Sequence, residues 1–126
     1  MGVNAKTAAL VLGFVFIIVG VLGYVPNPIV GPSGIFVTNQ VHNLIHIASG
    51  IVLLIGAYSS LGSSLALKII GVVYGLVAIL GFLMQGDMML GMVAMNAADR
   101  WLHVALAIVI LYAGFGLSAE SRIAAA

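Results

Sequence analysis

All three histidines of the chain lie in two polar stretches that share one spacing. The first stretch runs from Asn39 to His46, the second runs from Asn96 to His103, and each opens a long apolar run. Within the first stretch, His42 and His46 have the i, i+4 spacing that places two imidazoles on one side of a helix, as metal-binding helices require. Metal ligation is therefore the first chemistry that the pattern predicts.

The second stretch offers the same spacing with a carboxylate in place of one imidazole. If the two helix faces meet, they form a set of three imidazoles and one carboxylate: His42, His46, Asp99 and His103. Such a set suits a divalent ion such as zinc. Three amide side chains on the same faces are predicted to orient the ligating rings by hydrogen bonding: Asn39, Asn43 and Asn96.

Two other cofactors fit parts of the pattern. Paired histidines on facing membrane helices ligate haem axially, and His46 and His103 would be that pair. Copper is the second alternative, because thioethers favour Cu(I) and four methionines crowd the loop before the second stretch: Met88, Met89, Met92 and Met95. The first loop lacks methionines at the matching positions, which favours apolar packing as their role.

A structural role accounts for part of both stretches. Asparagine is among the best helix N-caps, and an acidic residue in the first turn is favoured by the helix dipole, so Asn39, Asn96 and Asp99 are predicted to cap helices. His46 and His103 lie about 10 Å further along their helices, where an ionisable side chain is costly and needs a partner. For these two, the structural alternative to a ligand is a hydrogen bond that holds the helices together.

The composition indicates a membrane protein. Hydrophobic residues make up 63% of the 126 residues and charged residues only 6%, far from the balance of a soluble domain. A net charge of +1 gives no reason to expect a nucleic-acid partner, and the lack of cysteine excludes disulfides and thiolate metal sites. We find no nucleophile–base pair, phosphate-binding loop or catalytic carboxylate pair, so the sequence does not indicate an enzyme.

The hydropathy pattern predicts an all-α bundle of four transmembrane helices in a single integral membrane domain covering residues 1–126. The predicted helices cover residues 8–25, 39–58, 65–84 and 97–117. A loop rich in proline and glycine, residues 26–37, joins the first two helices, and residues 85–95 join the last two. The serine-rich turn at residues 59–64 is predicted to supply a serine N-cap for the third helix.

The chain also reads as two copies of one helix–loop–helix unit. Besides the polar stretches, Leu22-Gly23-Tyr24 near the end of the first helix resembles Leu80-Gly81-Phe82 near the end of the third. Each copy crosses the membrane an even number of times, so a pseudo-twofold axis along the membrane normal would relate the copies as a parallel repeat. The polar stretches would then share one site between them.

The basic residues predict the orientation. Lys6, Lys68 and Arg122 lie on the side of the termini, and only Arg100 lies on the other side. The positive-inside rule then makes both termini cytoplasmic. In a bacterium the site would lie near the outer face of the inner membrane. The surroundings of the chain would be the lipid bilayer. An alternative role is an accessory subunit, and the chain could belong to a homo-oligomer or to a larger membrane complex.

The arrangement of the polar residues resembles a known family. The motifs are Asn39-x-x-His42-Asn43-x-x-His46 and Asn96-x-x-Asp99-x-x-x-His103, each at the start of a helix. They are similar to those of a bacterial family of small four-helix membrane proteins known only as a domain of unknown function, over nearly the whole chain. The resemblance implies the fold and the polar signature but no activity. Arg100 departs from the pattern, because an asparagine is expected there.

Overall fold

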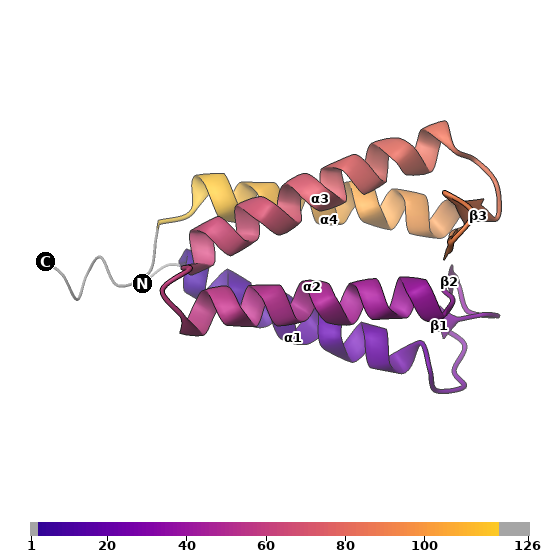
Figure 1. Cartoon of the computed structure of the whole chain (residues 1–126), viewed down its shortest axis with the longest axis horizontal. Helices are drawn as coiled ribbons and strands as arrows, with labels where there is room; N and C mark the ends of the chain where they lie inside the picture. Colours follow the sequence, from indigo (N-terminus) through magenta and orange to yellow (C-terminus); the bar gives the residue numbers. More distant parts are fainter. Residues whose placement is uncertain (1–2, 119–126) are drawn as a thin grey trace, which may run out of the picture.

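The computed structural model describes residues 3–118, which form two helix pairs packed side by side (Figure 1). The helices are α1 (Ala5–Leu22), α2 (Gln40–Tyr58), α3 (Ser63–Leu83) and α4 (Ala97–Gly116). All four are long and apolar enough to cross a membrane. The prediction of a four-span helical membrane protein is therefore confirmed.

The helix ends differ from prediction by a few residues. α1 begins at Ala5 because Asn4 caps it, accepting a hydrogen bond of 2.9 Å from the Thr7 backbone N–H. It ends at Leu22, after which the chain enters a turn. The expected serine cap of α3 is wrong, because Gly62 occupies the N-cap position at φ 87° without a side-chain bond.

Each long loop contains a pair of short strands that the sequence did not reveal. β1 (Val30–Gly31) pairs in parallel with β2 (Phe36–Val37), and β3 (Met88–Met89) pairs antiparallel with β4 (Val93–Ala94). Both loops lie at the end of the bundle opposite the start of α1, the end of α4 and the turn between α2 and α3 (Figure 1). Arg122, which contributed to the orientation argument, lies outside the described residues.

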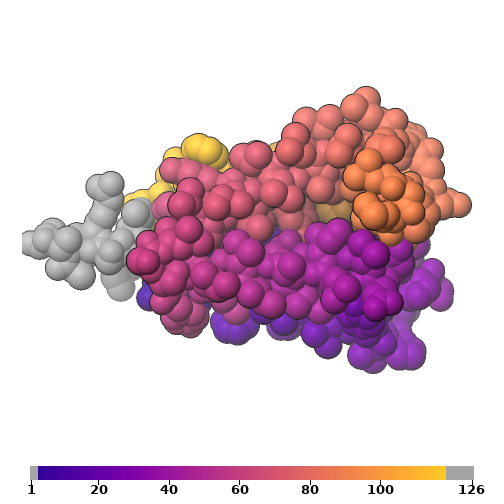
Figure 2. Space-filling view, in the orientation of Figure 1, coloured from indigo at the N-terminus to yellow at the C-terminus, as the bar shows by residue number. Residues whose placement is uncertain are grey.

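Close backbone contacts hold each pair together. α1 packs mainly on α2, and α3 packs mainly on α4. Gly13 and Gly50 face each other, since a Cβ on Gly13 would come within 3.2 Å of the Gly50 carbonyl oxygen. Small residues that permit such approach are typical of helix contacts in lipid. Figure 2 shows the side chains of α2 and α3 meeting along one face of the molecule.

A matched pair of hydrogen bonds ties the two halves together at the loop end. The Asn39 side chain donates to the Met92 carbonyl at 2.9 Å, and the Asn96 side chain donates to the Ile35 carbonyl at 2.9 Å. Met92 and Ile35 hold the same position relative to their loops and caps. The cap of each half therefore reaches the loop of the other, which fits the parallel repeat.

Candidate metal centre

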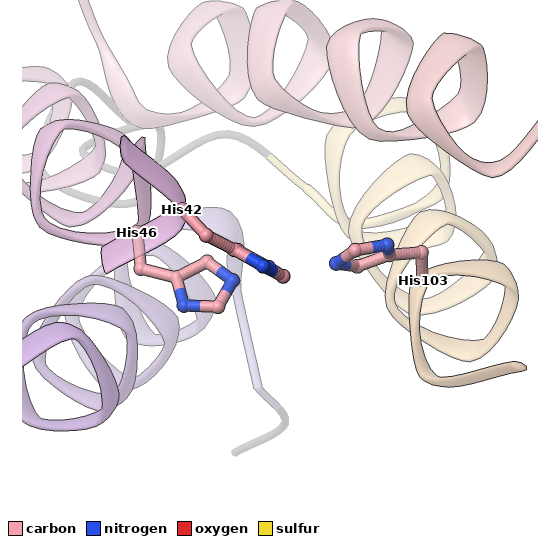
Figure 3. A group of neighbouring side chains, drawn as sticks. All are labelled: His42, His46 and His103. Atoms are coloured by element: carbon pink, nitrogen blue, oxygen red, sulfur yellow. The ribbon is translucent and has the colours of Figure 1, made fainter. Parts of the chain in front are cut away.

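The three histidines meet in the core between α2 and α4. His42 and His46 come from the first turns of α2 and His103 comes from α4, and they are 2%, 5% and 2% exposed. Each offers a ring nitrogen, and these nitrogens all lie within 4.8 Å of one another. Figure 3 shows the rings of His42 and His103 pointing toward each other, with His46 beside His42. The structure therefore brings the imidazoles of the two polar stretches together, as the spacing predicted.

The tautomer of His42 follows from its surroundings. Its Nδ1 lies 2.6 Å from the carbonyl oxygen of Ala94. A carbonyl only accepts, so Nδ1 carries the proton and donates, which in a neutral ring leaves a lone pair on Nε2. Nε2 is buried and has no hydrogen-bond partner among the described residues. Metal-binding histidines use this arrangement, in which one nitrogen donates to a carbonyl and the other faces the ion.

The other two rings also have unpaired nitrogens. The Nδ1 atoms of His46 and His103 are buried, and residues 3–118 supply neither with a hydrogen-bond partner. Their ring centroids are 6.4 Å apart, and the ring planes are inclined by 71° in a T-shaped arrangement. A buried polar atom without a partner costs about 1–3 kcal/mol. Mutual hydrogen bonding between these nitrogens therefore does not explain why both histidines are buried here.

Aromatic residues that the sequence reasoning missed form one side of the cluster. The ring of Tyr74 lies 5.9 Å from that of His103 and 5.0 Å from that of Phe16. The Tyr74 hydroxyl lies 2.9 Å from Ser49 Oγ, and because Ser49 donates to the Ile45 carbonyl at 2.7 Å, Tyr74 is the donor. A tyrosine in the middle of the apolar third helix, far from either interface, was the signal available in the sequence.

The space enclosed by the histidines is small. A cavity of about 20 Å³ is lined by the three histidines with Ile45, Tyr74, Val77, Met89, Val93 and Met95. This volume holds roughly one water molecule or one ion. A porphyrin could enter only if the helices separated, so the geometry favours a single ion over the haem alternative.

The methionines divide into two groups. Met89 and Met95 are 5% and 3% exposed and line the histidine cavity, whereas Met88 and Met92 are 43% and 54% exposed. Met89 and Met95 also pack in a small apolar cluster with Val93. Two thioethers of the copper hypothesis are therefore near the histidines, and the other two are at the surface.

Asp99 has a structural task in this arrangement. Its carboxylate Oδ2 accepts from the Asn96 backbone N–H at 3.0 Å, while its own N–H donates to Asn96 Oδ1 at 3.0 Å, which makes a capping box. The backbone of Val37 in β2 also interacts with this carboxylate. Among the described residues, the group of mutually close metal-ligating atoms comprises the three histidines without Asp99.

The asparagines also contact backbone groups. Asn39 Oδ1 accepts from the His42 backbone N–H at 3.0 Å, so the expected N-caps at Asn39 and Asn96 are both present. The amide nitrogens of both hold the opposite loop, as described above. The His42 ring is oriented by the hydrogen bond that it donates to the Ala94 carbonyl, a partner that no side-chain pattern could show. Asn43 is buried, and its Oδ1 has no partner within the described part of the chain.

Arg100 points away from the histidines. Its Nε donates to the Gly81 carbonyl at 2.7 Å and its Nη2 donates to the Gly86 carbonyl at 2.8 Å. Carbonyls at the C-terminal end of a helix attract a cation. The positive charge that would oppose a metal ion is therefore held at the end of α3.

Comparison with known proteins identifies the family and gives no activity. Residues 6–116 match the domain of unknown function DUF4383. No curated protein and no solved structure matches the chain. Because the match covers nearly all of the described helices, the chain belongs to the DUF4383 family of proteins.

Proposed function

We propose that this protein is a multi-pass protein of the bacterial inner membrane that binds a divalent metal ion, zinc in the first instance, through His42, His46 and His103. The observation that carries the proposal is the hydrogen bond from His42 Nδ1 to Ala94, which leaves a lone pair on Nε2 of a ring whose centroid lies 4.6 Å from that of His46 and 5.5 Å from that of His103. Three histidines with one open position are a common zinc site.

Binding would require a small inward movement of the rings. Two nitrogens on one tetrahedral zinc lie about 3.3 Å apart, given Zn–N distances of about 2.0–2.1 Å. The three histidine nitrogens lie within 4.8 Å of one another, so the rings would close by up to roughly 1.5 Å. With the His42 ring held by Ala94, rotation of the His46 and His103 side chains would have to supply most of this movement. The ion would replace the missing partners of the buried nitrogens.

The site would bind or pass on an ion rather than catalyse a reaction. Apart from the histidines and methionines, its cavity is lined by Ile45, Val77, Val93 and Tyr74. Tyr74 already donates to Ser49. We therefore assign no general base to the cavity wall.

The orientation in the membrane is part of the proposal. Lys6 lies over the ring of Tyr58 and Lys68 lies over the ring of Phe115, at the end of the bundle where α1 begins and α4 ends. The positive-inside rule favours placing this end in the cytoplasm. The histidine site would then lie near the outer face of the membrane, within reach of ions from that side.

Metal analysis of purified protein tests the proposal. The protein should carry a tag other than polyhistidine, be stripped with a chelator, be reloaded with zinc, and be measured by elemental analysis. We expect about one zinc per chain and a rise in the unfolding temperature on reloading. A variant with both His46→Ala and His103→Ala should lose the bound zinc and the zinc-dependent rise.

Two matched variants sharpen this test. Asp99→Asn should retain zinc, because Asp99 belongs to the helix cap; loss of zinc in this variant would restore the four-ligand set. Gln85→Ala, an exposed polar change in the second loop, should bind zinc like the wild type. If the wild type and the double histidine variant hold equal amounts of zinc, the metal proposal fails. The better interpretation would then be an accessory subunit in which the histidines only stabilise the bundle. Such a subunit should copurify with its partners.

Copper is a second candidate because Met89 and Met95 line the same cavity. Thioether and imidazole ligands together favour Cu(I). Competition between Zn²⁺ and Cu(I) for the stripped protein separates the two metals. If copper is the physiological ion, Met89→Leu with Met95→Leu should weaken Cu(I) binding and leave zinc binding unchanged.

A further inference from the structure

A β-hairpin covers the histidine cavity at the loop end of the bundle. It comprises β3, β4 and the turn between them, and we call it the 88–94 hairpin. It lies beside the starts of α2 and α4 (Figure 1). Met89 and Val93 are each 5% exposed and line the cavity, whereas Met88, on the opposite face of β3, is 43% exposed. The hairpin therefore separates the histidines from water at this end.

Apolar residues close the other sides of the cavity to an ion. Further along the bundle, toward the turn between α2 and α3, the core contains Leu53, Leu67 and Ile110, each 0% exposed. Ile45 and Val77 form the wall between α2 and α3, beyond which lies the hydrocarbon of the bilayer. Moving an ion through either region is costly. An ion from water therefore reaches the histidines most cheaply past the 88–94 hairpin.

Two hydrogen bonds from α2 and its cap hold the hairpin in place. Asn39 Nδ2 donates to the Met92 carbonyl at 2.9 Å in an exposed position, and His42 Nδ1 donates to the Ala94 carbonyl at 2.6 Å in a buried one. Within the hairpin, the Met92 N–H donates to the Met89 carbonyl at 3.1 Å and the two strands pair, so the hairpin can move as one unit. Water competes for an exposed hydrogen bond, which makes the Asn39 bond the easier of the two to break.

The matching bond of the other half holds a loop that does not line the cavity. Asn96 Nδ2 donates to the Ile35 carbonyl at 2.9 Å, and Ile35 is 62% exposed. Among the described residues, those that line the histidine cavity include none from the first loop. The two asparagines thus have the same contacts, but only Asn39 holds the cover of the histidine site.

We propose that the 88–94 hairpin is a lid over the histidine site, that Asn39 holds it closed, and that ions enter and leave when it lifts. The identity of the ion rests on the proposed function, whereas the lid itself does not. Lifting the hairpin breaks few contacts compared with unfolding, so it occurs as a local opening of the native protein. The site then exchanges ions with the water at the loop end alone.

Cysteine labelling tests the lid without a metal ion. Because the chain contains no cysteine, Met89→Cys places a single thiol on the buried side of the hairpin and Met88→Cys places one on the exposed side. The full chain in phosphatidylcholine nanodiscs is treated with a positively charged methanethiosulfonate, which does not enter hydrocarbon. We expect the thiol of Met89→Cys to react at least tenfold more slowly than that of Met88→Cys. Equal rates would show that the hairpin covers nothing and would overturn the proposal.

Serine substitutions test the role of Asn39. Serine caps a helix about as well as asparagine does, but its shorter side chain does not reach the opposite loop. In the Met89→Cys chain, Asn39→Ser should raise the labelling rate about fivefold, the effect of losing one hydrogen bond. Asn96→Ser makes the same change in the other half and should leave the rate unchanged. Equal labelling rates in the two serine variants would contradict the proposal.

Zinc exchange tests the same lid in chains without an added cysteine. The protein is loaded with zinc, and zinc release is followed after addition of excess chelator. Asn39→Ser should speed release about fivefold and Asn96→Ser should not, while both bind as much zinc as the wild type. Equal release rates in the two variants would overturn the lid. If the wild type binds no zinc, the proposed metal function fails, and cysteine labelling alone decides whether the hairpin is a lid.

Discussion

The Nδ1 atom of His42 donates a hydrogen bond of 2.6 Å to the backbone carbonyl of Ala94. The bond crosses between the two halves, because His42 lies in α2 and Ala94 lies in β4, just before α4. It fixes the direction of the imidazole and the position of its proton. The same contact thus positions the second loop on the first half and prepares Nε2 for a ligand.

The first prediction concerns the tautomer of His42. In metal-free protein near neutral pH, we expect a proton on Nδ1 and none on Nε2, because the Ala94 carbonyl can only accept. Nitrogen-15 NMR of histidine-labelled protein distinguishes the two nitrogens, and His42→Gln assigns the signal by removing it. A proton on Nε2, or on both nitrogens, would contradict the orientation that the metal proposal needs.

The second prediction concerns the asparagines that join the halves. Asn39→Ala and Asn96→Ala should each lower the free energy of unfolding by about 2 kcal/mol, since each loses a helix cap and a hydrogen bond to the opposite loop. Asn4→Ala is the matched control, because Asn4 caps α1 within its own half and should cost about 1 kcal/mol. Unfolding in mixed micelles measures the differences. Equal losses in all three variants would show that the bonds between the halves contribute nothing.

Much of this fold can be read from the sequence, because each span is a long apolar run and each asparagine cap precedes one. The spacing of His42, His46 and His103 also predicted correctly that the rings would meet. What the sequence could not show are contacts with the backbone. The position of the Ala94 carbonyl beside His42 depends on where β4 lies. Because every residue has a carbonyl, the sequence does not show that this one contacts His42. The spacing of Asp99 fits a ligand position and a capping position equally well. Its capping role becomes evident only when the start of α4 is known.

The third prediction concerns the contact between Gly23 and Asn43. A Cβ built on Gly23 would overlap the side-chain amide of Asn43. Gly23→Ala should therefore displace this amide and lower the free energy of unfolding by about 1–3 kcal/mol, the usual cost of overpacking. Gly86→Ala is the control, because a Cβ there meets nothing within 4 Å. Comparable stability of the two variants would mean that the Asn43 side chain can move at no cost.

The last prediction concerns the pH dependence of metal binding. Zinc and protons compete for the imidazole nitrogens, so lowering the pH from about 7 to about 3 should weaken zinc binding and reduce the zinc-dependent rise in the unfolding temperature. Three histidine ligands that titrate together would make the decline steeper than a single one would. Scanning calorimetry or a fluorescence melt, with and without zinc at each pH, measures the effect. The double variant with His46→Ala and His103→Ala should show the same unfolding temperature with and without zinc throughout this range. A zinc effect that this double variant retains would place the ion away from His46 and His103.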